Sequence, residues 1–215
     1  MRGDRTTLVV RPGHPVDTVV LTGCAIVWIW AAIDPIDAGT WRLEQIASVV
    51  GVGVFAWASH PIALSSWAKM SLGVLFCVHT VGTHYTYSLV PYDQLADWLF
   101  GVSVTDVLDL ERNHYDRFVH FAFGLFSLPA ITEAITHKLG VSRAANSFIG
   151  FNLVLSVSAA YEVLEWGAAV IFAGGATAYV GAQGDPWDAQ VDIALGGAGF
   201  LVAWACLSVG RMVGR

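Results

Sequence analysis

Residues 115–136 read YDRFVHFAFGLFSLPAITEAIT, an apolar run with ionisable residues gathered at its start. A helix needs about 20 mostly apolar residues to cross a hydrocarbon core about 30 Å thick, so this run is long enough to span a bilayer. Ionisable side chains inside a span usually face other helices, because exposing charge to lipid costs at least a few kcal/mol. The stretch therefore predicts a helical membrane protein in which this helix packs against others.

The same criterion finds further candidate spans on both sides, at 16–34, 43–59, 67–87, 147–173 and 187–209. The chain is 55% hydrophobic and 13% charged, and that charged fraction is roughly half that of a soluble domain. With no internal repeat or linker, we expect one all-α transmembrane domain over 1–215, with about six spans. The apolar segment 95–107 lies among acidic residues and predicts a short helix on the membrane interface.

Lysine and arginine are unevenly distributed between the loops. With six spans, one side carries Arg2, Arg5, Arg11, Lys69, Lys138, Arg143, Arg211 and Arg215, and the other carries Arg42, Arg112 and Arg117. The richer side is expected in the cytoplasm, which places both termini there. The net charge of −6 leaves no basic patch for nucleic acid. The three cysteines lie far apart and form no Cys-x-x-Cys pair, so a thiolate metal centre is not expected.

The ionisable residues of the expected spans concentrate toward the outer face. They include pairs on one helix face, because residues three or four apart are neighbours there; these are Asp116 with His120, Asp188 with Asp192, and Glu162 with Glu165. Carboxylates and imidazoles from separate helices build metal sites in bundles. We expect an outward-opening site with a divalent metal, such as zinc, manganese or magnesium, whose candidate ligands are His120, Glu162, Glu165, Asp192, His79 and His84.

Simpler roles are open for several of these residues. Asp116, Asp185 and Asp188 lie where helices are expected to begin, so each fits helix capping as well as a functional role. His79 and His84 are five residues apart and equally fit histidines hydrogen-bonded between helices. Arg117 fits a structural counter-ion as well as a substrate clamp. Capping cannot explain the four residues beyond the first turn, which are His120, Glu162, Glu165 and Asp192.

Aromatic residues near the expected span ends are typical of the belt that forms at a membrane–water interface. We expect Tyr85, Tyr87, Trp166 and Trp187 in this belt.

Four motifs together resemble the YjdF-like bacterial inner-membrane proteins over about residues 40–210. They are HTVGTHYTY (79–87), RNHYDRFVHF (112–121), YEVLEW (161–166) and GDPWDAQVD (184–192). The resemblance implies an inner-membrane location and a shared polar site, and names no reaction. A fainter similarity to VanZ-like membrane proteins rests on Asp116, Arg117, His120, Glu162 and Asp192, but Glu165 stands where that pattern usually has glutamine.

Three functions fit these residues. In an enzyme, the metal would activate water toward a lipid or envelope-linked substrate, with Asp188 orienting a ligating imidazole, Arg117 clamping an anionic group and Asp116 assisting. In an ion- or proton-coupled transporter, the same acids would be relay sites. In a non-catalytic membrane protein, the cluster would be a structural staple. No His-Glu-x-x-His motif is present to single out metallohydrolase chemistry.

Overall fold

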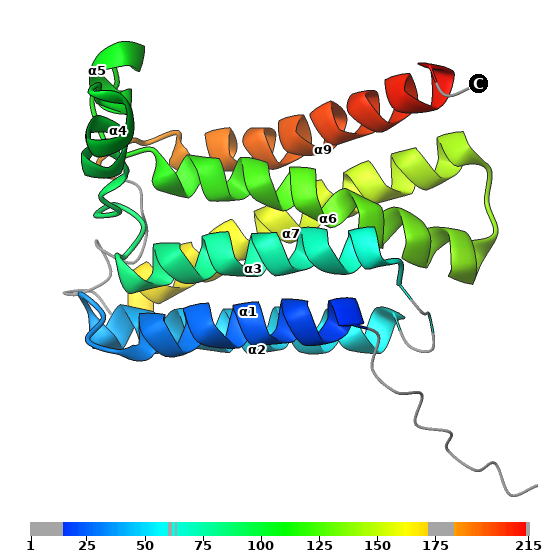
Figure 1. The fold of residues 1–215 in the computed structure, drawn as a ribbon, viewed down its shortest axis with the longest axis horizontal. Helices are drawn as coiled ribbons and strands as arrows, with labels where there is room; N and C mark the ends of the chain where they lie inside the picture. Colours follow the sequence, from blue (N-terminus) through cyan, green and yellow to red (C-terminus); the bar gives the residue numbers. More distant parts are fainter. Residues whose placement is uncertain (1–14, 60–61, 63, 172–182, 214–215) are drawn as a thin grey trace, which may run out of the picture.

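Long helices lying roughly along one axis form the body of the molecule, and two short helices cover one end (Figure 1). The structure is a computed structural model that describes residues 15–59, 62, 64–171 and 183–213. Its helices are α1 (Pro15–Ala32), α2 (Ala38–Ser59), α3 (Ser66–His84), α4 (Tyr92–Phe100), α5 (Val104–Leu108), α6 (Tyr115–Leu139), α7 (Arg143–Ile171) and α9 (Asp188–Val213). The described residues contain no strand, which confirms the all-α prediction.

Within the described residues, four helices are long and apolar enough to cross a membrane, namely α1, α6, α7 and the Asp188–Val209 part of α9. The helices α2 and α3 are similar in length, at 22 and 19 residues, and lie alongside the others (Figure 1). Each of the six expected ranges overlaps one of these long helices, although residues 172 and 173 of the fifth lie outside the described residues. Exposed side chains of α1 are largely apolar, as in Val19, Leu21 and Ile26, which suits a helix facing lipid.

The segment 95–107 forms parts of two short helices instead of the single one expected. Gly101 ends α4 with φ +71, a left-handed conformation that a residue without Cβ adopts without strain. The Ser103 hydroxyl then accepts a hydrogen bond from the Asp106 backbone N–H and so begins α5. Trp98 and Phe100 are strongly exposed on this hairpin. The apolar surface expected there is therefore present, but a glycine turn divides it between α4 and α5.

Two glycines allow α6 and α9 to approach at backbone distance. A Cβ at Gly124 of α6 would collide with the Gly196 carbonyl, and one at Gly199 of α9 would collide with the Phe121 carbonyl. Such small-residue contacts bring membrane helices close enough for their polar side chains to meet. His120 and Asp192 lie one turn before Gly124 and Gly196 respectively, so the close approach brings these two residues together.

Candidate functional site

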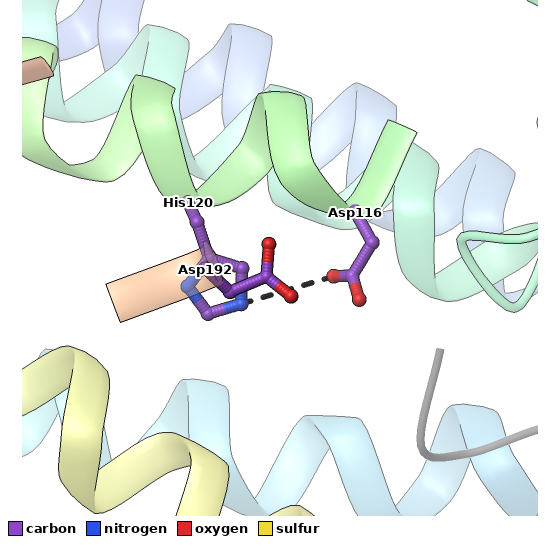
Figure 2. Close-up of side chains that lie close together, drawn as sticks. All are labelled: Asp116, His120 and Asp192. Atoms are coloured by element: carbon purple, nitrogen blue, oxygen red, sulfur yellow. Dashed lines mark ion pairs between the residues drawn. The ribbon is translucent and has the colours of Figure 1, made fainter. Parts of the chain in front are cut away.

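Three buried residues from α6 and α9 converge near the end of the bundle covered by α4 and α5. In Figure 2 the side chains of Asp116, His120 and Asp192 point toward one another. One possible ligand atom from each lies within 4.8 Å of the others, and all three side chains are buried. Asp116 Oδ1 lies 3.9 Å from His120 Nε2. The expected pair on α6 therefore meets Asp192 of α9.

A third helix adds a carboxylate to this group. Glu162 of α7 places Oε1 3.2 Å from His120 Nε2, yet without the geometry of a hydrogen bond, so this buried oxygen has no hydrogen-bond partner. Asp192 Oδ1 is also buried and unpartnered. We call Asp116, His120, Glu162 and Asp192 the ligand cluster. Glu165, also buried on α7, interacts electrostatically with three of its members, Asp116, Glu162 and Asp192.

Ser158 lies one turn before Glu162 on α7. Its hydroxyl is buried without a hydrogen-bond partner, and a Cβ added at Gly196 would lie 2.6 Å from it.

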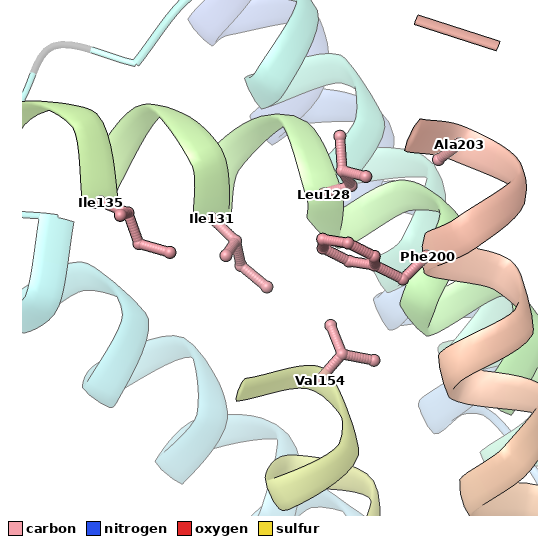
Figure 3. Close-up of a cluster of buried hydrophobic side chains, with 6 residues drawn as sticks. All are labelled: Leu128, Ile131, Ile135, Val154, Phe200 and Ala203. Atoms are coloured by element: carbon pink, nitrogen blue, oxygen red, sulfur yellow. The ribbon is translucent and has the colours of Figure 1, made fainter. Parts of the chain in front are cut away.

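Beyond the level of Ser158, toward the opposite end of the bundle, side chains of α6, α7 and α9 form an apolar cluster (Figure 3), namely Leu128, Ile131, Ile135, Val154, Phe200 and Ala203. The ligand cluster therefore sits at the polar end of a bundle whose middle is apolar.

Four charged side chains form ion pairs beside the ligand cluster. Arg112 and Arg117 each contact both Asp185 and Asp188. The closest pairs are Arg112 with Asp188 and Arg117 with Asp185, while the other two distances are 3.6 and 3.7 Å. We call these four residues the arginine gate. No other Lys or Arg of the described residues is ion-paired with a carboxylate at this end of the bundle.

The pKa shifts of two groups outside the spans, Asp185 and His114, indicate which charges are favoured at this end of the bundle. A hydrogen bond from the Trp187 backbone N–H, assisted by Arg117, holds the pKa of Asp185 below its ordinary value. Partial burial, reinforced by the positive charges of Arg117 and Arg112, lowers the pKa of His114. The charged form of Asp185 is therefore favoured in the arginine gate, and the charged form of His114 is disfavoured.

Hydrogen bonds link a second buried polar group, contributed by α2, α3, α7 and the turn after α3. Tyr161 donates to Glu44 Oε2 at 2.6 Å, and the Tyr87 hydroxyl lies 2.7 Å from His79 Nδ1 and 3.5 Å from Glu44 Oε2. Ser48 Oγ lies 2.7 Å from His79 Nε2. We call Ser48, His79, Tyr87, Glu44 and Tyr161 the tyrosine network. It adjoins the ligand cluster, because the Tyr161 ring stands edge-on to His120 with ring centroids 5.9 Å apart.

His79 lies between two hydroxyl groups. Its Nε2 lies 2.7 Å from Ser48 Oγ and its Nδ1 lies 2.7 Å from the Tyr87 hydroxyl. A hydroxyl group can either donate to or accept from an imidazole nitrogen, so both contacts can be hydrogen bonds to a neutral ring. His79 therefore has both ring nitrogens occupied by hydroxyl groups, the hydrogen-bonded role that the sequence left open for it.

His84 has a different environment from His79. Its Nδ1 lies 3.1 Å from the Ala31 carbonyl oxygen, and its ring stacks on Trp30 with centroids 4.5 Å apart. A spacing of five residues turns the two histidines to different faces of α3. His84 thus joins α3 to α1 and lies outside both the ligand cluster and the tyrosine network.

The expected place of Tyr87 in the interfacial belt is wrong. Tyr87 is only 4% exposed, whereas Trp166 and Trp187 are largely exposed. Thr86 and Tyr87 both have left-handed backbones, with φ +53 and +55, and the Tyr87 N–H donates to the Gly82 carbonyl. A Cβ at Gly82 would lie 2.5 Å from the Tyr87 ring. The turn after α3 thus folds Tyr87 back into the bundle, over a glycine.

Capping explains some of the aspartates and not others. At the start of α6, Asn113 Oδ1 accepts from the Tyr115 N–H at 3.0 Å, whereas Asp116 points into the ligand cluster (Figure 2). At the start of α9, Asp185 Oδ1 accepts from the Trp187 N–H at 2.9 Å while its other oxygen pairs with Arg117. Asp188 pairs with Arg112. Capping therefore accounts in part for Asp185 alone.

Sequence reasoning omitted several residues from the site. In the sequence, Arg112 bears only on the topology, and Glu44 lies near the start of the expected span 43–59 with no evident partner. Glu44 is fully buried with Oε1 unpartnered. A carboxylate seven residues into a helix of membrane-spanning length is a signal for it, since such groups usually face the bundle interior. Nothing in the spacing pointed to Tyr161 or Ser158.

Chemically, the ligand cluster is a set of hard oxygen donors around one imidazole nitrogen. Zinc and manganese accept such mixed ligands, while magnesium prefers oxygen alone. A buried carboxylate without a partner is costly unless it shares a cation or a proton. The arrangement can therefore hold a cation, and the arginine gate beside it can hold an anion.

Comparison with known proteins places the chain in a family. Residues 16–212 match the family described as "Predicted membrane protein (DUF2238)". The chain is 30% identical over 169 residues to the inner membrane protein YjdF of Escherichia coli (strain K12), which covers 78% of this chain and 77% of that protein. No solved structure matches. With four helices long and apolar enough to cross a membrane among the described residues, the chain is a membrane protein that belongs to the DUF2238 family.

Proposed function

We propose that this protein is a multi-pass inner-membrane protein that binds a divalent cation at the ligand cluster, near the outer face of the bilayer. The cation, zinc, manganese or magnesium, would activate water to hydrolyse or transfer a lipid or envelope-linked substrate. The inner-membrane location is supported by the relative YjdF, an inner membrane protein of Escherichia coli.

One observation carries the metal proposal. Ligand atoms of Asp116, His120 and Asp192 lie within 4.8 Å of one another, and the buried oxygens Asp192 Oδ1 and Glu162 Oε1 have no hydrogen-bond partner. Carboxylates repel one another when no cation lies between them, and leaving a buried acceptor unpaired costs about 1–3 kcal/mol. A divalent cation would remove both costs with residues already in place.

Six spans with both termini in the cytoplasm are part of the proposal. The helices α2 and α3 lie beside the four most apolar ones, and α1 starts at the end of the bundle where α9 finishes (Figure 1). The ligand cluster then faces outward together with α4 and α5. Single cysteines at Asp109 and Arg143, in a background without the native cysteines, test this: an impermeant reagent should label only the first in intact cells. Labelling of the second alone would reverse the orientation.

Metal content of the purified full-length protein is the direct test. Wild type is expected to retain about one divalent ion per chain after gel filtration, and Asp192→Asn and Glu162→Gln to lose it while still folded. Glu133→Gln is the matched control, because Glu133 is a half-buried acid of α6 at the other end of the bundle that accepts hydrogen bonds from Ser65. A metal-free wild type, after growth and purification with added zinc, manganese or magnesium, would refute the proposal.

The same variants separate a catalytic role from a structural one. A structural staple loses stability with its metal, because metal binding is then part of the folding free energy. A catalytic site should instead lose metal with little change in melting temperature. The apolar cluster in the middle of the bundle gives no support to a polar path across the membrane, so transport is not proposed.

A further inference from the structure

We propose that the arginine gate is a phosphate-binding site, so that the substrate of the adjoining ligand cluster carries a phosphate group. This inference rests on the proposed function, and it names the substrate class of that site. Arg112 and Arg117 would hold phosphate oxygens in the place that Asp185 and Asp188 occupy in the structure.

The two guanidinium groups converge on one pair of oxygens. Arg112 Nη2 and Arg117 Nη2 both contact Asp185 Oδ2 and Asp188 Oδ1. The two cations share two oxygens that come from different side chains, so the four charges form one group instead of two separate salt bridges. Two oxygens of a single phosphate present a similar target, and arginine is well suited to bind it because its planar fork matches phosphate geometry.

Arg117 has unused binding capacity. Its Nε is buried and has no hydrogen-bond partner, although Nε and Nη2 together form the edge that binds an oxyanion side-on. Asp185 therefore uses only half of that edge, through Nη2. A tetrahedral phosphate has enough oxygens to engage Nε of Arg117 and the Nη2 atoms of both arginines, which the two aspartates do not achieve.

The location suits a phosphate that reacts at the ligand cluster. Arg117 follows Asp116 in the chain, Asp188 lies one turn before Asp192, and Asp192 interacts electrostatically with both arginines. A phosphate held by the arginines would therefore present its remaining oxygens toward the ligand cluster. The Asp185 side chain is 26% exposed, so it can turn toward solvent when a phosphate takes its place.

Phosphate binding to the purified full chain tests this inference. Inorganic phosphate, dihexanoyl phosphatidic acid and dihexanoylglycerol are titrated by calorimetry in a non-ionic detergent, once with EDTA and once with the metal restored. Wild type is expected to bind a phosphate-bearing probe and not dihexanoylglycerol. Arg117→Gln should weaken this binding at least tenfold. Asp185→Asn should strengthen it several-fold, because the substitution removes an internal competitor for the same guanidinium groups.

Arg42→Gln is the matched control and should leave binding unchanged, since Arg42 lies near the same end of the bundle and its Nε donates to the Ala38 carbonyl. Tighter binding of phosphatidic acid than of inorganic phosphate would assign the phosphate to a lipid headgroup. Equal binding would assign it to a soluble phosphate. No binding of either probe, or no strengthening by Asp185→Asn, would overturn the inference.

Failure of this inference is distinguishable from failure of the proposed function. The EDTA arm measures the arginine gate with no metal present, and metal content is measured without phosphate. If Arg117→Gln does not fold, Asp185→Asn still tests the inference. The Asp185 side chain is partly exposed and asparagine has the same shape, so this variant should fold, and a gain in phosphate affinity is expected.

Discussion

The two buried polar groups of this protein use similar residue types at the same end of the bundle, but they differ in how their polar atoms are satisfied. In the tyrosine network, hydroxyl groups occupy both nitrogens of His79 and one oxygen of Glu44. In the ligand cluster, oxygens of Glu162 and Asp192 are buried without hydrogen-bond partners. Because hydroxyl groups donate protons and carboxylates do not, the tyrosine network leaves one oxygen, Glu44 Oε1, without a partner among the described residues, whereas the ligand cluster, which contains no hydroxyl group, needs a cation or protons from elsewhere.

The largest expected effect comes from separating α6 and α9, which assemble the ligand cluster. Gly124→Leu would drive a side chain into the backbone of α9 at Gly196, and we expect a loss of about 3 kcal/mol or more, with little folded protein recovered. Thermal unfolding followed by circular dichroism in detergent measures this. Gly51→Ala is the control, because nothing lies within 4 Å of a Cβ there. Equal stability of the two variants would contradict the close helix contact.

Removing a carboxylate from the ligand cluster should affect the metal-free protein in the opposite direction. Asp192→Asn relieves repulsion between Asp192 and the nearby carboxylates of Asp116 and Glu162. We therefore expect its melting temperature in EDTA to rise by about 2–4 °C, equivalent to about 1 kcal/mol, while bound metal is lost. A lower melting temperature in EDTA would mean that Asp192 is already satisfied within the protein.

The tyrosine network should respond as a purely structural element. Tyr161→Phe removes the 2.6 Å hydrogen bond to Glu44 and leaves a fully buried carboxyl group less satisfied, which costs about 1–3 kcal/mol. Metal content is expected to be unchanged. Tyr85→Phe is the control, because the Tyr85 hydroxyl makes no hydrogen bond to the described residues. Loss of metal in Tyr161→Phe would mean that the tyrosine network and the ligand cluster act as one site.

The smallest effect concerns acid pH at the arginine gate. The pKa of Asp185 is lowered by the Trp187 N–H and then by Arg117, so its stabilising contribution is complete above the ordinary aspartate value of about 3.9 and is lost as the pH falls through the lower folded value. Trp187 fluorescence should report a transition below about pH 4. Asp185→Asn should abolish it. A transition that persists in this variant would belong to another group.

The apolar composition and length of its segments predicted much of the fold, since each of six expected ranges overlaps a long helix. The pairs Asp116 with His120 and Glu162 with Glu165 were also predictable, because spacing along a helix determines which side chains share a face. The break at Gly101 was missed, since an apolar run does not reveal which glycine adopts a left-handed conformation.

The spacing of residues along the chain did not predict the contacts between helices. His79 and His84 looked equivalent, yet one is enclosed by Ser48 and Tyr87 while the other stacks on Trp30. Tyr87 resembled an interfacial aromatic until the left-handed turn at Thr86 placed it over Gly82. Arg112 was assigned only to a loop, although it shares two carboxylates with Arg117.

Local sequence therefore determines the helices, the end of the bundle at which their polar residues gather, and the faces that those residues share. Only the tertiary structure decides which faces meet, because that depends on how closely α6 and α9 approach at Gly124 and Gly199 and on where the turns direct side chains such as Tyr87. From the sequence, Asp192 is one more acid in a span. The backbone approach of α6 and α9 is what brings it within 4.8 Å of His120.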